Sequence, residues 1–353
     1  MPHPTIENET PLVIEPVYLE DEEGRPIVTA VVKATFDILP RGQLMLADEQ
    51  RPLEAAGSFW GHPEHSSYRF EPELAPIKTN TDVAVVGHAY APKPRTTIMD
   101  VGVRIGPVSK GIRVFGERMW FQTGMGHHVL TNPQPFERMP IQYERAFGGW
   151  DRSDPNPTRH TCERRNTLGR GFHASSSWPG TDDYAPNLEE PTALITDYKD
   201  EPPPASLGFT LPGWLPRAKF AGTFDAAWEA TRKPLLPADF DRRFFNGASP
   251  GLVAPGFLRG DEPIQVVGMR PEGGLALALP GIAPPQLRIS VMGRPDERPT
   301  LALDTVILDL DAMQLILLWR GRARLPDGPA DVRMMELISE PARSFPRANG
   351  AAT

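Results

Sequence analysis

Apolar and polar residues alternate early in the chain, in the pattern of a β-strand with one buried face. From Val28 to Ile38 every second residue is apolar, and Val31 is the one apolar residue on the opposite face. A period of two predicts a half-buried strand. The preceding segment 21–26 contains Asp, Gly and Pro, the residue types of turns. We therefore expect a hairpin over residues 11–46.

A second group of strands follows after a long loop. Residues 41–79 are rich in Pro, Gly and His and predict that loop. Three strands are expected at residues 81–89, 96–105 and 111–121. The segment 106–110 between the last two has the length of a hairpin loop. These segments define an N-terminal β region, residues 1–131.

The middle of the chain, residues 132–263, has a weaker pattern because Pro and Gly recur every few residues. Only short helices are compatible with that spacing. The best candidate covers residues 224–231, with Thr223 as its N-cap. Phe224 and Trp228 are four residues apart, so they share one face of this helix, and we expect that face to be buried.

The last part of the chain returns to a strand pattern. Short strands are expected at residues 264–269, 275–279, 287–292 and 300–303, followed by a hairpin with strands at 305–310 and 313–319. Residues 264–340 thus form a C-terminal β region. Residues 341–353 are a polar tail that should fray.

The expected fold class is mainly β. It has sandwich or barrel-like antiparallel sheets at both ends, a long loop-dominated middle rich in Pro and Gly, and a few short helices. The 41 prolines and 31 glycines among 353 residues support this class, because proline fixes φ and removes a backbone donor. The regions are also compatible with one continuous unit.

Charge and cysteine content narrow the functional classes. The formal net charge is −8 and no basic patch stands out, so nucleic acid is not an expected partner. Cys162 is the single cysteine, which leaves no internal disulfide and no sign of an oxidising compartment. The N-terminus lacks a signal-peptide pattern, and no apolar run approaches the ~20 residues of a membrane span. We expect a cytoplasmic protein with no membrane partner.

One serine lies in a pattern typical of hydrolases. Residues 247–251 fit G-x-S-x-G around Ser249. The nucleophile elbow uses the backbone N–H of the next residue in its oxyanion hole, and here that residue is Pro250, which has no N–H. The elbow also needs a strand before it and a helix after it, and neither is expected. We interpret the segment as a structural turn and expect no catalytic residue.

The histidines are candidate metal ligands. His62 and His65 flank Pro63-Glu64, and His127 and His128 are adjacent. Zinc uses such side chains, but the loop context gives no helical ligand spacing and Cys162 is the single cysteine. We therefore favour histidines that are hydrogen-bonded to backbone or water. No phosphate loop or dinucleotide fingerprint is present. We expect no metal and no cofactor, and keep a metal-dependent hydrolase as the alternative function.

Three motif stretches carry a resemblance to a known family: residues 143–151, residues 165–172 with 186–191, and residues 214–246. The last is the most specific, because many aromatic, Arg and Asp positions match in order. The chain resembles the domain-of-unknown-function family 2169, over roughly residues 13–319.

The resemblance implies a role in type VI secretion. Members of the family are associated with type VI secretion clusters, where some act as adaptors or chaperones. The implied function is to bind a toxin effector protein and help load it onto the VgrG spike protein, with or without a PAAR-type tip. A permanent structural part of the secretion machine is a further alternative.

The motif residues have two interpretations. In one they fix irregular loops through charge pairs and through glycines that allow φ > 0; this group comprises Glu144, Arg145, Gly148, Gly149, Asp151, Arg170, Asp225, Asp239, Asp241 and Arg243. In the other, aromatic and Arg side chains form the surface that binds the partner; these candidates are Trp214, Arg217, Trp228, Phe244 and Phe245. An adaptor needs both.

Overall fold

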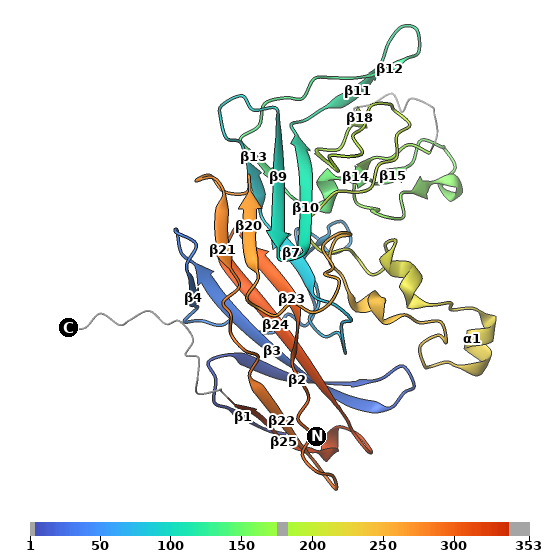
Figure 1. Cartoon of the computed structure of the whole chain (residues 1–353). Coiled ribbons are helices and arrows are strands. Elements are labelled where there is room, and N and C mark those ends of the chain that lie inside the picture. Colours follow the sequence, from blue (N-terminus) through green and yellow to red (C-terminus); the bar gives the residue numbers. More distant parts are fainter. Residues whose placement is uncertain (1–3, 175–182, 339–353) are drawn as a thin grey trace.

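The computed structural model describes residues 4–174 and 183–338 (Figure 1). The largest sheet has the order β2–β3–β24–β23–β7, and β4 pairs with β3. Its strands are β2 (Val13–Glu20), β3 (Pro26–Ile38), β4 (Leu44–Leu46), β7 (Asp82–Val86), β23 (Ala302–Asp309) and β24 (Gln314–Arg324). The expected mainly β class with antiparallel sheets is confirmed, and the described sheets remain open rather than closing into a barrel.

This sheet combines strands from the N-terminal and the C-terminal parts of the chain. β3 and β24 run antiparallel over a register that extends from the pair Ile27–Arg324 to the pair Asp37–Gln314. β23 then lies parallel to β7. The C-terminal hairpin β23–β24 is therefore inserted between two N-terminal strands, and the N-terminal and C-terminal β regions share one sheet.

Two further sheets complete the framework. One has the order β19–β10–β9–β20–β21 and the other β1–β25–β22. The first comprises β19 (Leu188–Glu189), β10 (Val108–Phe115), β9 (Ile98–Ile105), β20 (Pro263–Val267) and β21 (Leu275–Ala278). The second comprises β1 (Thr5–Asn8), β25 (Val332–Ile338) and β22 (Gln286–Val291).

One hydrophobic core joins the three sheets. It includes Val32 of β3, Ile112 of β10 and Ile289 of β22, each fully buried. The opposite face of β3 is covered as well, since Val31 belongs to a second buried cluster and the Lys33 ammonium contacts both carboxylate oxygens of Glu73 at 2.8 Å. The expectation that this strand is half-buried is wrong, because the loops after β4 pack across its outer face.

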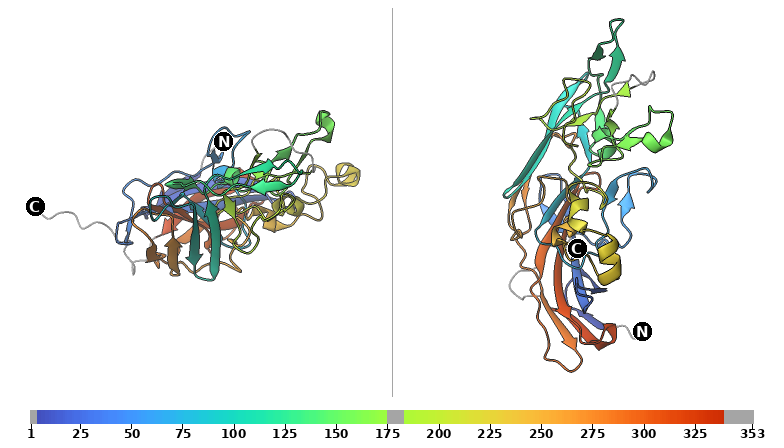
Figure 2. Two further views of the ribbon diagram at one scale, coloured as in Figure 1. Left: turned by 90° about the horizontal axis from the view of Figure 1, so that it is seen from above. Right: turned by 90° about the vertical axis from the view of Figure 1, so that its right-hand side faces the viewer.

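Short elements and loops occupy the other side of the framework, where the segment with α1 projects from the sheets (Figure 2). The helix is α1 (Ala226–Thr231), and the 3-10 turns are η1 (Tyr143–Arg145), η2 (Pro157–Arg159), η3 (Arg217–Ala221), η4 (Arg242–Phe245) and η5 (Pro329–Asp331). The short strands are β5 (Ser58–Phe59), β6 (Tyr68–Phe70), β8 (His88–Tyr90), β11 (Met119–Gln122), β12 (His128–Leu130), β13 (Arg138–Pro140), β14 (Phe147–Gly148), β15 (Trp150–Asp151), β16 (Thr161–Cys162), β17 (Arg170–Gly171) and β18 (Asp183–Tyr184).

Several predicted boundaries differ from the structure. The predicted loop 106–110 is only a two-residue turn, because β10 begins at Val108. The two predicted strands on either side of Asp304 are one strand, β23, with a bulge at that residue. Strand β25 was not predicted, and the polar tail lies outside the described residues. Within the described residues, no helix is long and apolar enough to cross a membrane.

Candidate partner-binding site

Residues 214–246 form a layer of loops beside the large sheet, with α1 at its outer end (Figure 1). Asp225 begins the helix, since its carboxylate accepts a 2.8 Å hydrogen bond from the Trp228 N–H. The predicted cap, Thr223, instead donates to Asp239 from its backbone N–H (2.9 Å) and hydroxyl (2.8 Å). These bonds lower the pKa of the Asp239 carboxyl. The N-cap prediction is wrong by two residues, because Asp225 caps the helix while Asp239 binds the loop at Thr223.

The turn before η4 is fixed in the same way. Asp241 accepts hydrogen bonds from the Arg243 backbone N–H at 2.9 Å and from its Nε at 2.8 Å. This pairing lowers the pKa of Asp241. The Arg243 guanidinium also lies 4.4 Å from the centre of the Phe220 ring, within the range of a cation–π contact. Arg243 therefore joins η3 to η4.

Arg217 connects this loop layer to the body of the molecule. Its Nη1 donates to the Thr210 carbonyl at 2.8 Å and to Glu71 at 3.3 Å, and its Nε donates to the Phe244 carbonyl at 2.8 Å. The side chain is only 11% exposed. A guanidinium used in this way holds loops in place and has little surface left for a partner.

A pocket opens between the loop layer and the sheet edge. We call it the loop pocket; its volume is about 220 Å³, and its walls include Pro216, Arg217, Phe220, Arg243, Pro250 and Val253. Val253 is 36% exposed, so the pocket is open to solvent. Phe240, Phe244 and Phe245 pack against one another, with ring centroids 5.4–5.9 Å apart, and are not among its walls. The site offers a partner an apolar recess with arginines around it.

Buried charges support the loop pocket from below. The Lys78 ammonium contacts Glu71 at 2.5 Å and Asp82 at 2.6 Å. Asp82 also accepts from the Asn246 side chain at 3.0 Å and from the Gly247 N–H at 2.9 Å. Burial alone would lower the pKa of Lys78, but the two carboxylates outweigh it and raise that pKa. No local pattern in the sequence pointed to this network, which joins Asp82 to residues 246–247, more than 160 positions further along the chain.

The first two motif stretches are held by a second charge cluster. Arg145 donates to Glu117 at 2.5 Å and to the Asn187 side chain at 3.2 Å. Arg170 donates to the other Glu117 oxygen at 2.9 Å and also to Asn187. Glu117 lies outside the motifs and was not predicted. Arg145 thus pairs with a carboxylate elsewhere in the chain and not with its motif neighbours.

The remaining motif residues fix the backbone of loops that lie near or far along the chain. Glu144 accepts from the Ser67 backbone N–H at 2.6 Å and from its hydroxyl at 2.8 Å. Asp151 accepts from the backbone N–H of Ser153 at 2.9 Å. Gly148 and Gly149 have φ values of +148° and +97°, and a side chain at either position would collide with a backbone oxygen of the loop 166–169. The expected positive φ and close backbone approach are confirmed.

A family model covers this whole arrangement. The model described as "Uncharacterized protein conserved in bacteria (DUF2169)" matches residues 23–320. The chain belongs to this family. No curated protein and no solved structure matches the chain. The match includes every DUF2169 motif stretch described above, so the loop layer and its pocket lie within the family region.

The aromatic candidates of the DUF2169 chain divide between core and surface. Trp214 is 2% exposed, packs edge-on against Tyr143 with centroids 5.1 Å apart, and donates to Thr167 at 3.0 Å. It belongs to the core, and its assignment to a partner surface is corrected. Trp228 is half-buried, whereas Phe224 is 56% exposed and precedes the N-cap Asp225. The expectation that both share a buried helix face is therefore wrong.

Ser249 is completely buried in the DUF2169 fold. Its hydroxyl donates to the Ser206 carbonyl at 2.8 Å and lies 2.9 Å from the Tyr143 hydroxyl. The Lys110 ammonium donates to it at 3.1 Å. Burial lowers the pKa of Lys110, although Glu190 acts in the opposite direction. The neighbours of Ser249 line the loop pocket, but its own side chain points into a filled polar cluster.

The histidines group differently from the prediction. His62 and His65 lie near each other, with ring centroids 5.8 Å apart, and no group of three metal-ligating side chains occurs among residues 4–174 and 183–338. Sequence analysis missed that His128 and His173 stack on the Tyr198 ring at 3.9 and 4.1 Å. Burial lowers the pKa of His173.

Proposed function

We propose that this DUF2169 chain is a non-catalytic adaptor that binds a type VI secretion toxin effector in the cytoplasm and helps load it onto the VgrG spike. The loop pocket carries the proposal. It is an apolar recess of about 220 Å³ within the family region, and its walls are fixed by Arg217 and by the Asp241–Arg243 pair. A preformed recess binds a partner side chain without a large ordering cost.

The chemistry of the rim indicates what enters. Phe220 is contacted by the Arg243 guanidinium at 4.4 Å and by the Lys219 ammonium at 5.5 Å. Both pocket arginines are already paired with carboxylates, Arg243 with Asp241 and Arg217 with Glu71, so a cargo segment with an apolar or aromatic side chain complements the site. Aromatic and Arg groups of this kind dominate interface energetics.

A charge placed in the loop pocket tests the proposal. The Val253→Glu variant adds a carboxylate at the wall without removing a side-chain hydrogen bond. Val267→Glu is the matched control, because Val267 is 60% exposed on β20 and does not line the pocket. Each variant is co-expressed with the toxin encoded beside it, and the amount of toxin that co-purifies is measured.

We expect Val253→Glu to weaken binding by about tenfold or more, since desolvating an unpaired charge costs more than 1.4 kcal/mol. Val267→Glu should bind like wild type. If both variants bind the toxin equally well, the loop pocket is not part of the interface. A wild-type chain that fails to retain the toxin or VgrG under any condition would contradict the adaptor function itself.

A further inference from the structure

Within the described residues, the outer edge of β22 is paired at Ile289, and at its end the Val291 carbonyl accepts a hydrogen bond from the Arg294 N–H at 3.3 Å. On its inner side β22 pairs with β25 along its length. On its outer side Ile289 and Glu297 exchange two backbone hydrogen bonds, each 2.9 Å long. Because N–H and C=O groups of a strand alternate between its two edges, those of Leu287 point outward as well.

Proline ends this pairing. In the antiparallel register set by Ile289 and Glu297, the next hydrogen-bonded pair is Leu287 with Pro299. Pro299 has no N–H to donate. The chain diverges there, and within the described residues the outward N–H and C=O of Leu287 have no backbone partner.

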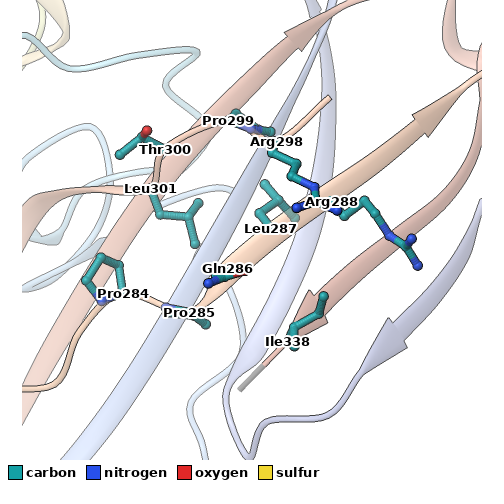
Figure 3. Close-up of a pocket in the computed structure, with 10 residues that line it drawn as sticks. All are labelled: Pro284, Pro285, Gln286, Leu287, Arg288, Arg298, Pro299, Thr300, Leu301 and Ile338. Atoms are coloured by element: carbon teal, nitrogen blue, oxygen red, sulfur yellow. The ribbon is translucent and has the colours of Figure 1, made fainter. Parts of the chain in front are cut away.

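A pocket lies where β22 and the segment that contains Pro299 diverge. We call it the edge pocket; its volume is about 400 Å³ (Figure 3). Pro284, Pro285, Leu301 and Ile338 supply apolar walls, and Arg298 lies at its margin. Such a volume holds one or two side chains of a bound segment next to the free backbone edge.

The charged side chains at the margin of the edge pocket are arginines, Arg288 and Arg298, although the chain has a net charge of −8. Arg288 is already neutralised, since it pairs with Glu336 and lies 3.7 Å from Asp296. Arg298 is exposed and forms no ion pair with any residue in the described ranges. It is therefore available to an anionic group from outside.

We propose that the outer edge of β22 binds a short extended segment of a partner protein. The segment's main chain pairs with the N–H and C=O of Leu287 and so extends the β1–β25–β22 sheet. One apolar side chain of the segment occupies the edge pocket, and a neighbouring carboxylate contacts Arg298. The proposal depends on the edge geometry and not on the type VI role, and its site is separate from the loop pocket.

A library of random heptapeptides displayed on phage, selected against the full-length chain, tests this assignment. The selected sequences should combine an apolar residue with an acidic neighbour. The best of them, made synthetically with a fluorescent label, is then titrated by anisotropy. Binding should slow hydrogen exchange at the Leu287 amide, because the partner segment would then accept a hydrogen bond from it.

Two variants and a control complete the experiment. Arg298→Glu reverses the charge at the margin, and Thr300→Trp fills the edge pocket, which Thr300 lines from an exposed position. Each should weaken peptide binding by about tenfold or more. Arg294→Glu, at another exposed arginine of the same loop, should change it less than about twofold. Melting temperatures show whether each variant is folded. If Thr300→Trp does not fold, the binding measurement with Arg298→Glu alone tests the proposal.

Three outcomes would overturn the proposal. They are the absence of enriched peptides, peptides that bind both variants as tightly as wild type, and unchanged exchange at Leu287. Concentration-dependent dimers that Thr300→Trp abolishes would instead assign the edge to a second copy of this chain. None of these results bears on toxin binding at the loop pocket, so the two proposals fail separately.

Discussion

Lys78 is 3% exposed and contacts Glu71 and Asp82. Both carboxylates also bind the loop layer, Glu71 through Arg217 and Asp82 through Asn246. Arg145, in contrast, pairs with Glu117 at the surface, and both side chains are about a third exposed. The two basic residues therefore differ in how much their removal should cost.

We expect Lys78→Met to lower the free energy of unfolding by about 3–5 kcal/mol, because it leaves two buried carboxylates without their cation. Arg145→Ala should cost only about 1 kcal/mol, since solvent screens its pair and Arg170 still binds Glu117. Urea denaturation of both variants measures the difference. Equal losses would show that the Lys78 pairs are not more strongly coupled than surface pairs.

The same lysine should make stability depend on alkaline pH. Its pKa in the folded chain is raised by the two carboxylates, which outweigh burial. Its contribution is then fully present below the ordinary lysine pKa and is lost as the pH rises through the raised value. Lys78→Met should lack this part of the alkaline destabilisation, and a variant that follows the wild-type curve would contradict the sign.

Substitution of Ser249 distinguishes a structural role of this residue from a catalytic one. Its hydroxyl is buried and surrounded by Lys110, Tyr143 and Ser206. We expect Ser249→Ala to leave toxin-dependent killing of neighbouring cells intact, with a stability loss of about 1–3 kcal/mol from the unsatisfied partners. A killing defect in a variant that folds and binds cargo normally would restore a catalytic interpretation.

At the scale of secondary-structure elements, periodicity predicted the positions of strands better than it predicted which of their faces are buried. The hairpin β2–β3 and the hairpin β23–β24 were predicted because their alternating or branched apolar residues are local signals. Burial of both faces of β3 depends on contacts with loop residues 19 to 47 positions away, which no local pattern describes. β25 was missed, although its pairing with β22 gives it the same alternation of buried and exposed residues.

The candidate site shows the same limit. Sequence composition identified the residues that fix loops, because Asp, Arg and Gly types suit that purpose at any position. It did not show which aromatic residues face solvent, so Trp214 was assigned to the surface and is core. Phe220 and Val253, which line the loop pocket, come from segments 33 residues apart and meet only in the fold.

Helix α1 offers a test at the scale of one element. It has six residues, and its N-cap bond comes from Asp225. We expect Asp225→Ala to speed hydrogen exchange in residues 226–231, because losing such a cap costs about 0.5–2 kcal/mol. Thr223→Ala should leave exchange at the helix N-terminus unchanged. If Thr223→Ala speeds this exchange and Asp225→Ala does not, Thr223 and not Asp225 caps the helix.

At the scale of the molecule, the sheets form a framework shared by the N-terminal and C-terminal parts of the chain, and the motif stretch 214–246 builds the loop layer beside it. This separation suits an adaptor, since a rigid body can present the loop pocket and the edge of β22 on different parts of its surface. The proposed function requires that the chain acts in delivery of the toxin and not in the toxin's activity.

Expression of the cognate toxin inside a target cell that lacks this chain tests that requirement most directly. Survival of the target is measured with and without co-expression of the chain. The adaptor account predicts that the toxin kills equally in both cases, while deletion of the chain in the attacking cell abolishes killing by this toxin and leaves other effectors active. A toxin that kills the target only when the chain is co-expressed would contradict the account, because the chain would then be an activator of the toxin.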